Sequence, residues 1–229
     1  MSSKEIDEFL RLLKGSPSRA VFNPWWEVDE QNDIGRNAPA IRRRQLRAYL
    51  QKRVGKANVA VIGEAVGYRG GHFSGIPMTS ERLLLGRNEE FQLKPGDFFG
   101  INPRRTSKPE KYPDGFSEPT ATIVWGALLR LGLKPEQFVL WNAFPWHSFD
   151  SRRGMLSNRM PNKSERAAGL PVLKAFLELF SRDQVVALGK IAAAQLEELN
   201  VDAHCIRHPA SGGARLFRQQ IAKVVQELW

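Results

Sequence analysis

Cysteine is almost absent from the sequence, since Cys205 is the only one among 229 residues. A single thiol cannot form a disulfide within the chain, and it cannot supply the four cysteines of an iron–sulfur cluster or a structural zinc site. We therefore expect a protein of a reducing compartment, with the cytoplasm as the default location. We expect it to need neither a metal nor a cofactor.

Long apolar runs are also missing. No stretch approaches the roughly 20 apolar residues of a membrane-spanning helix, and no apolar segment with a cleavage site predicts a signal peptide. The contents of 42% hydrophobic and 25% charged residues are typical of a globular protein. The length favours one domain over residues 1–229, with a helical, basic arm over 1–56 and an α/β core over 57–229.

Acidic residues are lacking between Arg36 and Lys56, where eight Lys and Arg occur without one Asp or Glu. The whole chain carries a formal charge of +10. Such a positive field attracts polyanions, and nucleic acid is the most frequent of these partners. The alternative is a solvated helix face on a protein that happens to be basic.

Apolar runs alternate with helical patterns along the core, which predicts a parallel sheet covered on both faces. The expected strands are 58–63, 138–143, 184–188 and 203–207, and the expected helices are 119–131, 164–180, 190–199 and 214–229. The connection after the first strand is too long for one crossover. It contains a short helix over 80–85 and the glycine-rich stretch "GEAVGYRGGHFSGIP" at 63–77.

Polar residues follow the predicted strands at the points where each of them ends. They are Glu64, Asn142, Lys190 and His208. Ligands of open parallel sheets bind beyond the carboxyl ends of the strands. An acid, an amide and an imidazole should therefore meet at one edge of the sheet and form a site there.

Three of these stretches resemble motifs of the uracil-DNA glycosylase superfamily. They are "GEAVG" with "FSG" downstream, "VLWNAFPWHSF" and "RHPASGGARLF", and the resemblance runs from about Val59 to the C-terminus. It implies a three-layer α/β/α sandwich around a four-stranded parallel sheet, in agreement with the strand count. It also implies a monomeric, monofunctional hydrolase that flips deoxyuridine out of single- or double-stranded DNA and releases uracil.

The resemblance implies a role for each matching residue. Phe73 corresponds to the aromatic residue that stacks on the flipped base, Asn142 to the amide that reads uracil, and His208 to the histidine at the pyrimidine O2. Glu64 would be catalytic, orienting water or opposing the sugar cation; the alternative is a loop carboxylate satisfied by backbone N–H groups. Ala65 stands where the best-known branch has its catalytic Asp, and it is expected to contact the uracil.

Three differences from the family leave the base range open. Val66 replaces a Pro, Gly67 stands where one branch has the Tyr that excludes thymine, and the cysteines of the iron–sulfur branch are missing. Tyr68 is expected to wall off the C5 position of the base. The alternatives are excision of hypoxanthine or xanthine, and a non-catalytic module that binds abasic sites.

The expected DNA contacts lie in two parts of the chain. The turn after His208 and Pro209 should enter the minor groove, with Arg215 or Leu216 filling the gap that the base leaves. The residues expected to bind DNA are Ser211, Gly212, Gly213, Arg215, Lys190, Arg104 and Arg105.

Overall fold

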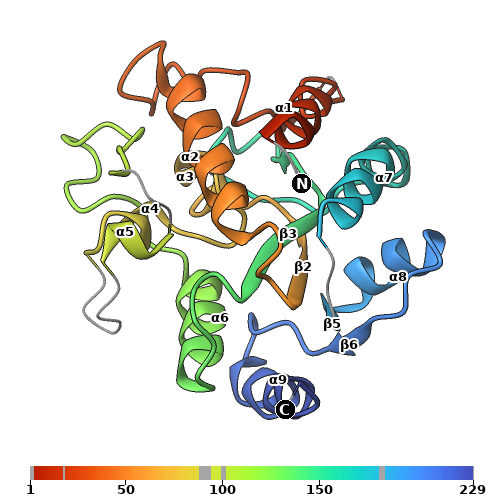
Figure 1. Ribbon diagram of the computed structural model, residues 1–229. Coiled ribbons are helices and arrows are strands. Elements are labelled where there is room, and N and C mark those ends of the chain that lie inside the picture. Colours follow the sequence, from red (N-terminus) through yellow and green to blue (C-terminus); the bar gives the residue numbers. More distant parts are fainter. Residues whose placement is uncertain (1–2, 18, 88–93, 99–101, 181–183, 229) are drawn as a thin grey trace.

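The computed structural model describes residues 3–17, 19–87, 94–98, 102–180 and 184–228. Its centre is a sheet of four parallel strands in the order β3-β2-β5-β6 (Figure 1). The strands are β2 (Val59–Ala65), β3 (Phe138–Phe144), β5 (Gln184–Leu188) and β6 (His204–Ile206). Each begins within one residue of the predicted start, so the sequence prediction of the sheet is confirmed. None of the described helices is long and apolar enough to cross a bilayer.

Helices cover both faces of the sheet. Figure 1 shows α6 (Pro119–Arg130) and α9 (Ala214–Gln226) on one side, and α7 (Lys163–Glu178) and α8 (Lys190–Glu198) on the other. Residues 59–62 of β2 are buried and apolar, and β3 is buried along its whole length, as strands covered on both faces must be. The predicted three-layer α/β/α sandwich is therefore confirmed.

The connection between β2 and α6 folds into short helices. These are α3 (Gly71–Ser74), α4 (Glu81–Leu84) and α5 (Pro95–Phe98). Ser80 caps α4 by accepting a hydrogen bond from the backbone N–H of Leu83, which explains the predicted start of this helix. The buried carboxylate of Glu81 accepts hydrogen bonds from the backbone N–H groups of Thr106 and Ser107 and so ties the loop to α4.

The N-terminal arm contains α1 (Ser3–Leu12) and α2 (Ala38–Arg53), and two of the basic residues of α2 are buried. Arg42 is completely buried, with its guanidinium 2.7 Å and 2.9 Å from the two carboxylate oxygens of Asp33. Arg53 is also buried and donates to the carbonyl of Phe138. The expectation that this run of cations mainly attracts nucleic acid is therefore wrong for its buried members, because those charges hold the fold together.

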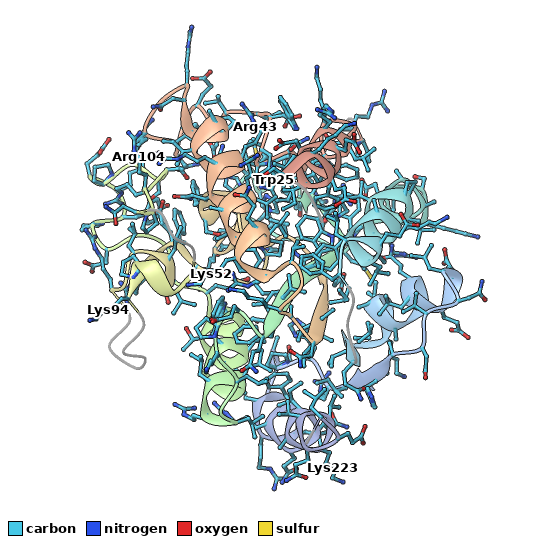
Figure 2. The ribbon with its side chains drawn as sticks, viewed as in Figure 1. Trp25, Arg43, Lys52, Lys94, Arg104 and Lys223 are labelled. Carbon is cyan, nitrogen blue, oxygen red and sulfur yellow. The ribbon has the colours of Figure 1, made fainter. Side chains whose placement is uncertain are left out.

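Half-buried and exposed basic side chains are spread over the molecule. Figure 2 shows Arg43, Lys52, Lys94 and Arg104 along the side of α2 and α5, and Lys223 at the opposite end on α9. Arg43 stacks on Trp26, with its guanidinium 4.2 Å from the ring centroid. The net charge of +10 is thus a diffuse property of the surface.

A second, two-stranded sheet was not predicted. It pairs β1 (Val21–Phe22) with β4 (His147–Ser148) in antiparallel fashion, and strands of two residues leave no periodic pattern in a sequence. His147 lies buried in it and donates from Nε2 to the carbonyl of Ser157 at 2.8 Å. Its Nδ1 then accepts from Nδ1 of His72 at 3.0 Å. Burial and the neighbouring His72 lower the pKa of His147 to about 3.

Candidate active site

A pocket of about 370 Å³ opens at the carboxyl ends of the central strands. Several separate parts of the chain supply its polar groups, among them the end of β2, the end of β3 and the loop after β6. Its lining residues are Gly63, Glu64, Ala65, Val66, Gly67, Met78, Glu118, Thr120, Asn142, Ser148, Asn158, Arg159, Met160, His208 and Ala210. The expected convergence of Glu64, Asn142 and His208 is therefore present.

Asn142 is the most unusual of these residues. Its side chain is 1% exposed, yet neither the amide nitrogen nor the amide oxygen has a hydrogen-bond partner in the described structure. Buried amides are nearly always paired, and leaving one unpaired costs about 1–3 kcal/mol per group. The unpaired amide in the wall of the pocket is therefore available to hydrogen-bond a ligand.

Gly63 makes room for this amide. It is the parallel-strand neighbour of Asn142, and a methyl group at Gly63 would lie only 2.6 Å from the amide oxygen. The same methyl group would lie 3.0 Å from the sulfur of Met78. The glycine therefore allows two pocket side chains to lie against the β2 backbone.

His208 is held in one tautomer by the loop that follows it. Its Nδ1 accepts a hydrogen bond from the backbone N–H of Ala210 at 3.1 Å. Burial lowers the pKa of His208 below its usual value, and the charge of Arg207 lowers it further. The imidazole is thus neutral at pH 7 and carries its proton on Nε2, where it can serve as a hydrogen-bond donor.

Glu64 occupies the penultimate position of β2 and is half-buried. Burial raises the pKa of its carboxyl group, while the charge of Arg166 partly offsets the shift. The described structure gives its carboxylate no backbone N–H partner, so the alternative of a satisfied loop carboxylate receives no support. The carboxylate is available to a ligand in the pocket.

Phe73 is not part of the pocket, and its predicted stacking role is wrong for this structure. The ring is fully buried and lies parallel to that of Phe116, with centroids 4.2 Å apart and an angle of 8°. The Thr106 hydroxyl also donates to its carbonyl at 2.6 Å. The neighbouring glycines suggested an exposed ring, but a phenylalanine distant in the sequence covers it.

Met78 supplies an apolar surface in the pocket that sequence reasoning missed. It is 6% exposed and has a left-handed backbone, with φ of +48°. A thioether makes favourable contacts with aromatic rings. Its side chain is therefore suited to lie against a planar guest, the role that the sequence assigned to Phe73.

Tyr68 and Ala65 differ in their positions. Ala65 lines the pocket as expected. Tyr68 does not: its hydroxyl accepts from Arg69 at 2.9 Å and its ring meets Phe116 edge-on. The Tyr68 ring therefore lies outside the pocket in which its contact with the base was predicted.

The comparison with protein families agrees with this site. Residues 53–228 match the model of the uracil DNA glycosylase superfamily. The chain belongs to this superfamily. It is accordingly a DNA glycosylase, an enzyme class that hydrolyses N-glycosidic bonds of DNA.

A solved structure supports the fold of the glycosylase over nearly its whole length. The crystal structure of wild-type SMUG2 from Pedobacter heparinus superposes with a TM-score of 0.64, covering 98% of this chain and 97% of that one. The sequence identity is 14%, so the likeness concerns the fold alone. Among curated proteins no match was found.

The turn that follows His208 is exposed on the surface of the glycosylase. Ser211 and Gly212 are exposed and both have positive φ values, +52° and +76°. Gly213 leads into α9, where Arg215 and Leu216 are exposed. The side chain of Leu216 is large, apolar and 46% exposed, so it is available to contact DNA.

The guanidinium of Arg105 already forms hydrogen bonds within the protein. Its guanidinium donates to the carbonyls of Ser107 and Pro113, each at 3.0 Å, and also to Tyr112, so it has few donors left for phosphate. This argues against its predicted DNA contact. Lys190 at the start of α8 is exposed, as is Arg104, whose side chain lines a second cavity of about 220 Å³ beside α2.

Glu118 is the other residue that sequence reasoning missed. It immediately precedes α6 and lines the pocket, so the glycosylase has two carboxyl groups there. In the sequence it reads only as a polar residue before the Pro that opens a helix, and nothing in that pattern indicates burial. Among the described residues, no group of three His, Cys, Asp or Glu could hold a metal ion.

Proposed function

We propose that this glycosylase hydrolyses the N-glycosidic bond of deoxyuridine in DNA, releasing uracil and leaving an abasic site. The observation that carries the proposal is the buried, unpartnered amide of Asn142 in one pocket with Glu64 and His208. These are an amide for reading, a carboxylate for the sugar and an imidazole for the leaving base.

Asn142 supports a choice of uracil over cytosine. Its amide offers one donor and one acceptor, which match uracil O4 and N3–H. Cytosine would place a donor against a donor and an acceptor against an acceptor. Each buried group left unpaired costs about 1–3 kcal/mol, which is enough for strong rejection.

His208 and Glu64 support the bond cleavage. As the bond breaks, negative charge develops on the base and positive charge on the sugar. The Nε2–H of neutral His208 would donate to the base carbonyl, a preorganised contact worth about 3–4 kcal/mol in other enzymes. The Glu64 carboxylate would oppose the cation or orient water. No lysine lines the described pocket, in keeping with hydrolysis without a Schiff base.

Base flipping requires a side chain that fills the vacated stack. Leu216, on the first turn of α9, is an exposed apolar candidate, and Met160 at the pocket is 59% exposed. Apolar wedges of this type unstack base pairs at a cost of a few kcal/mol. Lys190 and the Ser211 turn would hold the flanking phosphates, since both are exposed.

A second candidate is excision of a larger deaminated base, hypoxanthine or xanthine. The observation in its favour is that Gly67 lines the pocket and contributes no side chain to it. Tyr68, the expected barrier, does not line it.

The test is incubation of labelled single-uracil oligonucleotides with the protein in EDTA, followed by alkali. Strand scission with free uracil released supports the proposal, whereas release only from hypoxanthine or xanthine oligonucleotides supports the second candidate. Tight retention of an abasic oligonucleotide without release from any base would instead identify a binding module. Asn142→Ala and His208→Ala should lose far more activity than DNA affinity, and equal losses would contradict their roles.

A further inference from the structure

Glu118 has an unusual environment for a carboxyl group. Its Oε2 atom is buried and has no hydrogen-bond partner in the described structure. The residue stands at the N-cap position of α6, but its side chain does not cap the helix. A structural role as a cap is therefore not what holds this side chain in the pocket.

Two glycines of the loop after β2 accommodate the carboxyl group. A methyl group at Gly67 would lie 3.1 Å from its Oε1, and a methyl group at Gly70 would collide with its Oε2. Neither glycine has the positive φ that would require glycine on backbone grounds. Their lack of side chains leaves space that the Glu118 carboxyl group fills.

The groups around the pocket do not neutralise Glu118. Arg159 is the cation of the lining, and it forms a bidentate pair with Glu165 at 2.6 Å and 2.7 Å. Glu64 is a second acid, and His208 is neutral at pH 7. Burial raises the pKa of Glu118 to about 7.

Tyr68 and Arg69 are the ionisable side chains on the turn between the two glycines. They bond to one another, since Arg69 donates to the Tyr68 hydroxyl. Arg69 is exposed and forms no ion pair with Glu118 among the described residues, and burial alone accounts for the raised pKa of Glu118. The neutral, protonated form is the one that this environment favours.

We propose that Glu118 contacts the extruded base as a neutral carboxylic acid and donates a hydrogen bond to one of its acceptor atoms. The inference rests on the proposed function and deepens it, because it adds a base-contacting residue to Asn142 and His208. Glu64 and Glu118 then divide the work, with an anionic carboxylate toward the sugar and a neutral one toward the base.

The charge of the leaving base explains why the neutral form is needed. Cleavage leaves the bonding electron pair on the base, which becomes an anion. A carboxylate in the same pocket would repel this anion, whereas a carboxylic acid stabilises it by donation. Environments that separate the protonation states of two carboxyl groups are a recurring arrangement in enzymes.

The experiment measures single-turnover base release between pH 5.5 and 8.5 for the wild type, Glu118→Gln, Glu118→Ala and a surface control, Glu110→Gln. For the wild type and the control, release should fall above pH 7, approaching about tenfold per pH unit. Glu118→Gln keeps a donor but cannot ionise, so it should retain activity within about tenfold and lose this fall. Glu118→Ala should lose at least about tenfold at pH 6, the cost of one hydrogen bond.

Two outcomes would overturn the inference while base release itself persists. One is a Glu118→Gln variant as defective as Glu118→Ala, because Glu118 would then act as an anion. The other is a fall above pH 7 that Glu118→Gln retains, because another group would then be titrating.

A binding measurement separates this inference from the proposed function. Binding of free uracil, hypoxanthine and xanthine is followed by NMR at pH 6 and pH 8.5 in the wild type and Glu118→Gln. If no base is excised but one binds more weakly at pH 8.5 only in the wild type, the proposed function fails and the contact stands. If no base binds and none is released, both fail.

Discussion

Gly63 and Asn142 are neighbours across two parallel strands, and the glycine has no Cβ where the amide oxygen of the asparagine lies. The amide is thereby held in the pocket wall without a partner of its own. In the proposed function, this pair would link the backbone of the sheet directly to recognition of the base. It also makes two substitutions informative, one on each strand.

Asn142→Ala should separate activity from stability. The amide makes no hydrogen bond within the described structure and its unpaired burial is unfavourable, so its removal should not lower the free energy of unfolding. Base release should fall at least about 100-fold, since two hydrogen bonds to the base are lost. Chemical denaturation and single-turnover kinetics check the two halves. A large loss of stability would show that the amide is structural.

Gly63→Ala should damage the site from the opposite strand. The new methyl group would lie 2.6 Å from the Asn142 amide oxygen and 3.0 Å from the Met78 sulfur, so both side chains must move. Overpacking of this kind costs about 1–3 kcal/mol, and base release should fall as well. Gly96→Ala, where a methyl group meets nothing within 4 Å, is the matched control. Kinetics like those of the control would contradict the close fit.

The buried ion pair of Arg42 and Asp33 should contribute to the free energy of unfolding and should not contribute to DNA binding. Asp33→Ala leaves a buried guanidinium without its carboxylate and should cost about 3–5 kcal/mol. The double variant Arg42→Met with Asp33→Leu should recover part of this loss. Urea denaturation measures both, and the salt dependence of DNA binding by the folded double variant should equal that of the wild type. A shallower salt slope would mean that Arg42 reaches phosphate.

Glu118 should also make stability depend on pH. With its pKa raised to about 7, the folded protein retains a proton that the unfolded chain loses near pH 4.5. The contribution of Glu118 to the free energy of unfolding is therefore fully present below pH 4.5 and is lost as the pH rises toward 7. Glu118→Gln should gain about 1–3 kcal/mol over the wild type at pH 8 and almost nothing at pH 4.5. Thermal unfolding across this range, compared with Glu110→Gln, provides the test, and parallel curves would contradict it.

The sequence predicted the parts of the fold that depend on local patterns. The run Val59–Ile62 predicted a buried strand, and the alternation of strands with helices predicted the parallel sheet. Because parallel strands end at one edge, the convergence of Glu64, Asn142 and His208 was predictable as well.

The remaining features depend on contacts between segments far apart in the chain. The position of Phe73 depends on Phe116, which covers its ring. The environment of Glu118 depends on two glycines about fifty residues earlier. The pairing of β1 with β4 joins two dipeptides that carry no periodicity. The tautomer of His208 depends on a single backbone N–H.

The N-terminal fifty residues bear on any attempt to shorten the enzyme. The indole of Trp25 donates to the carbonyl of Gly75, behind the loop that leads to Met78, and Leu13 accepts from Trp146. The superfamily match begins only at residue 53. Trimming the chain to that boundary would remove the residues that pack behind the loop leading to Met78 and would expose aromatic rings to water. Homology limits are therefore a poor guide to the smallest unit that can still fold and act.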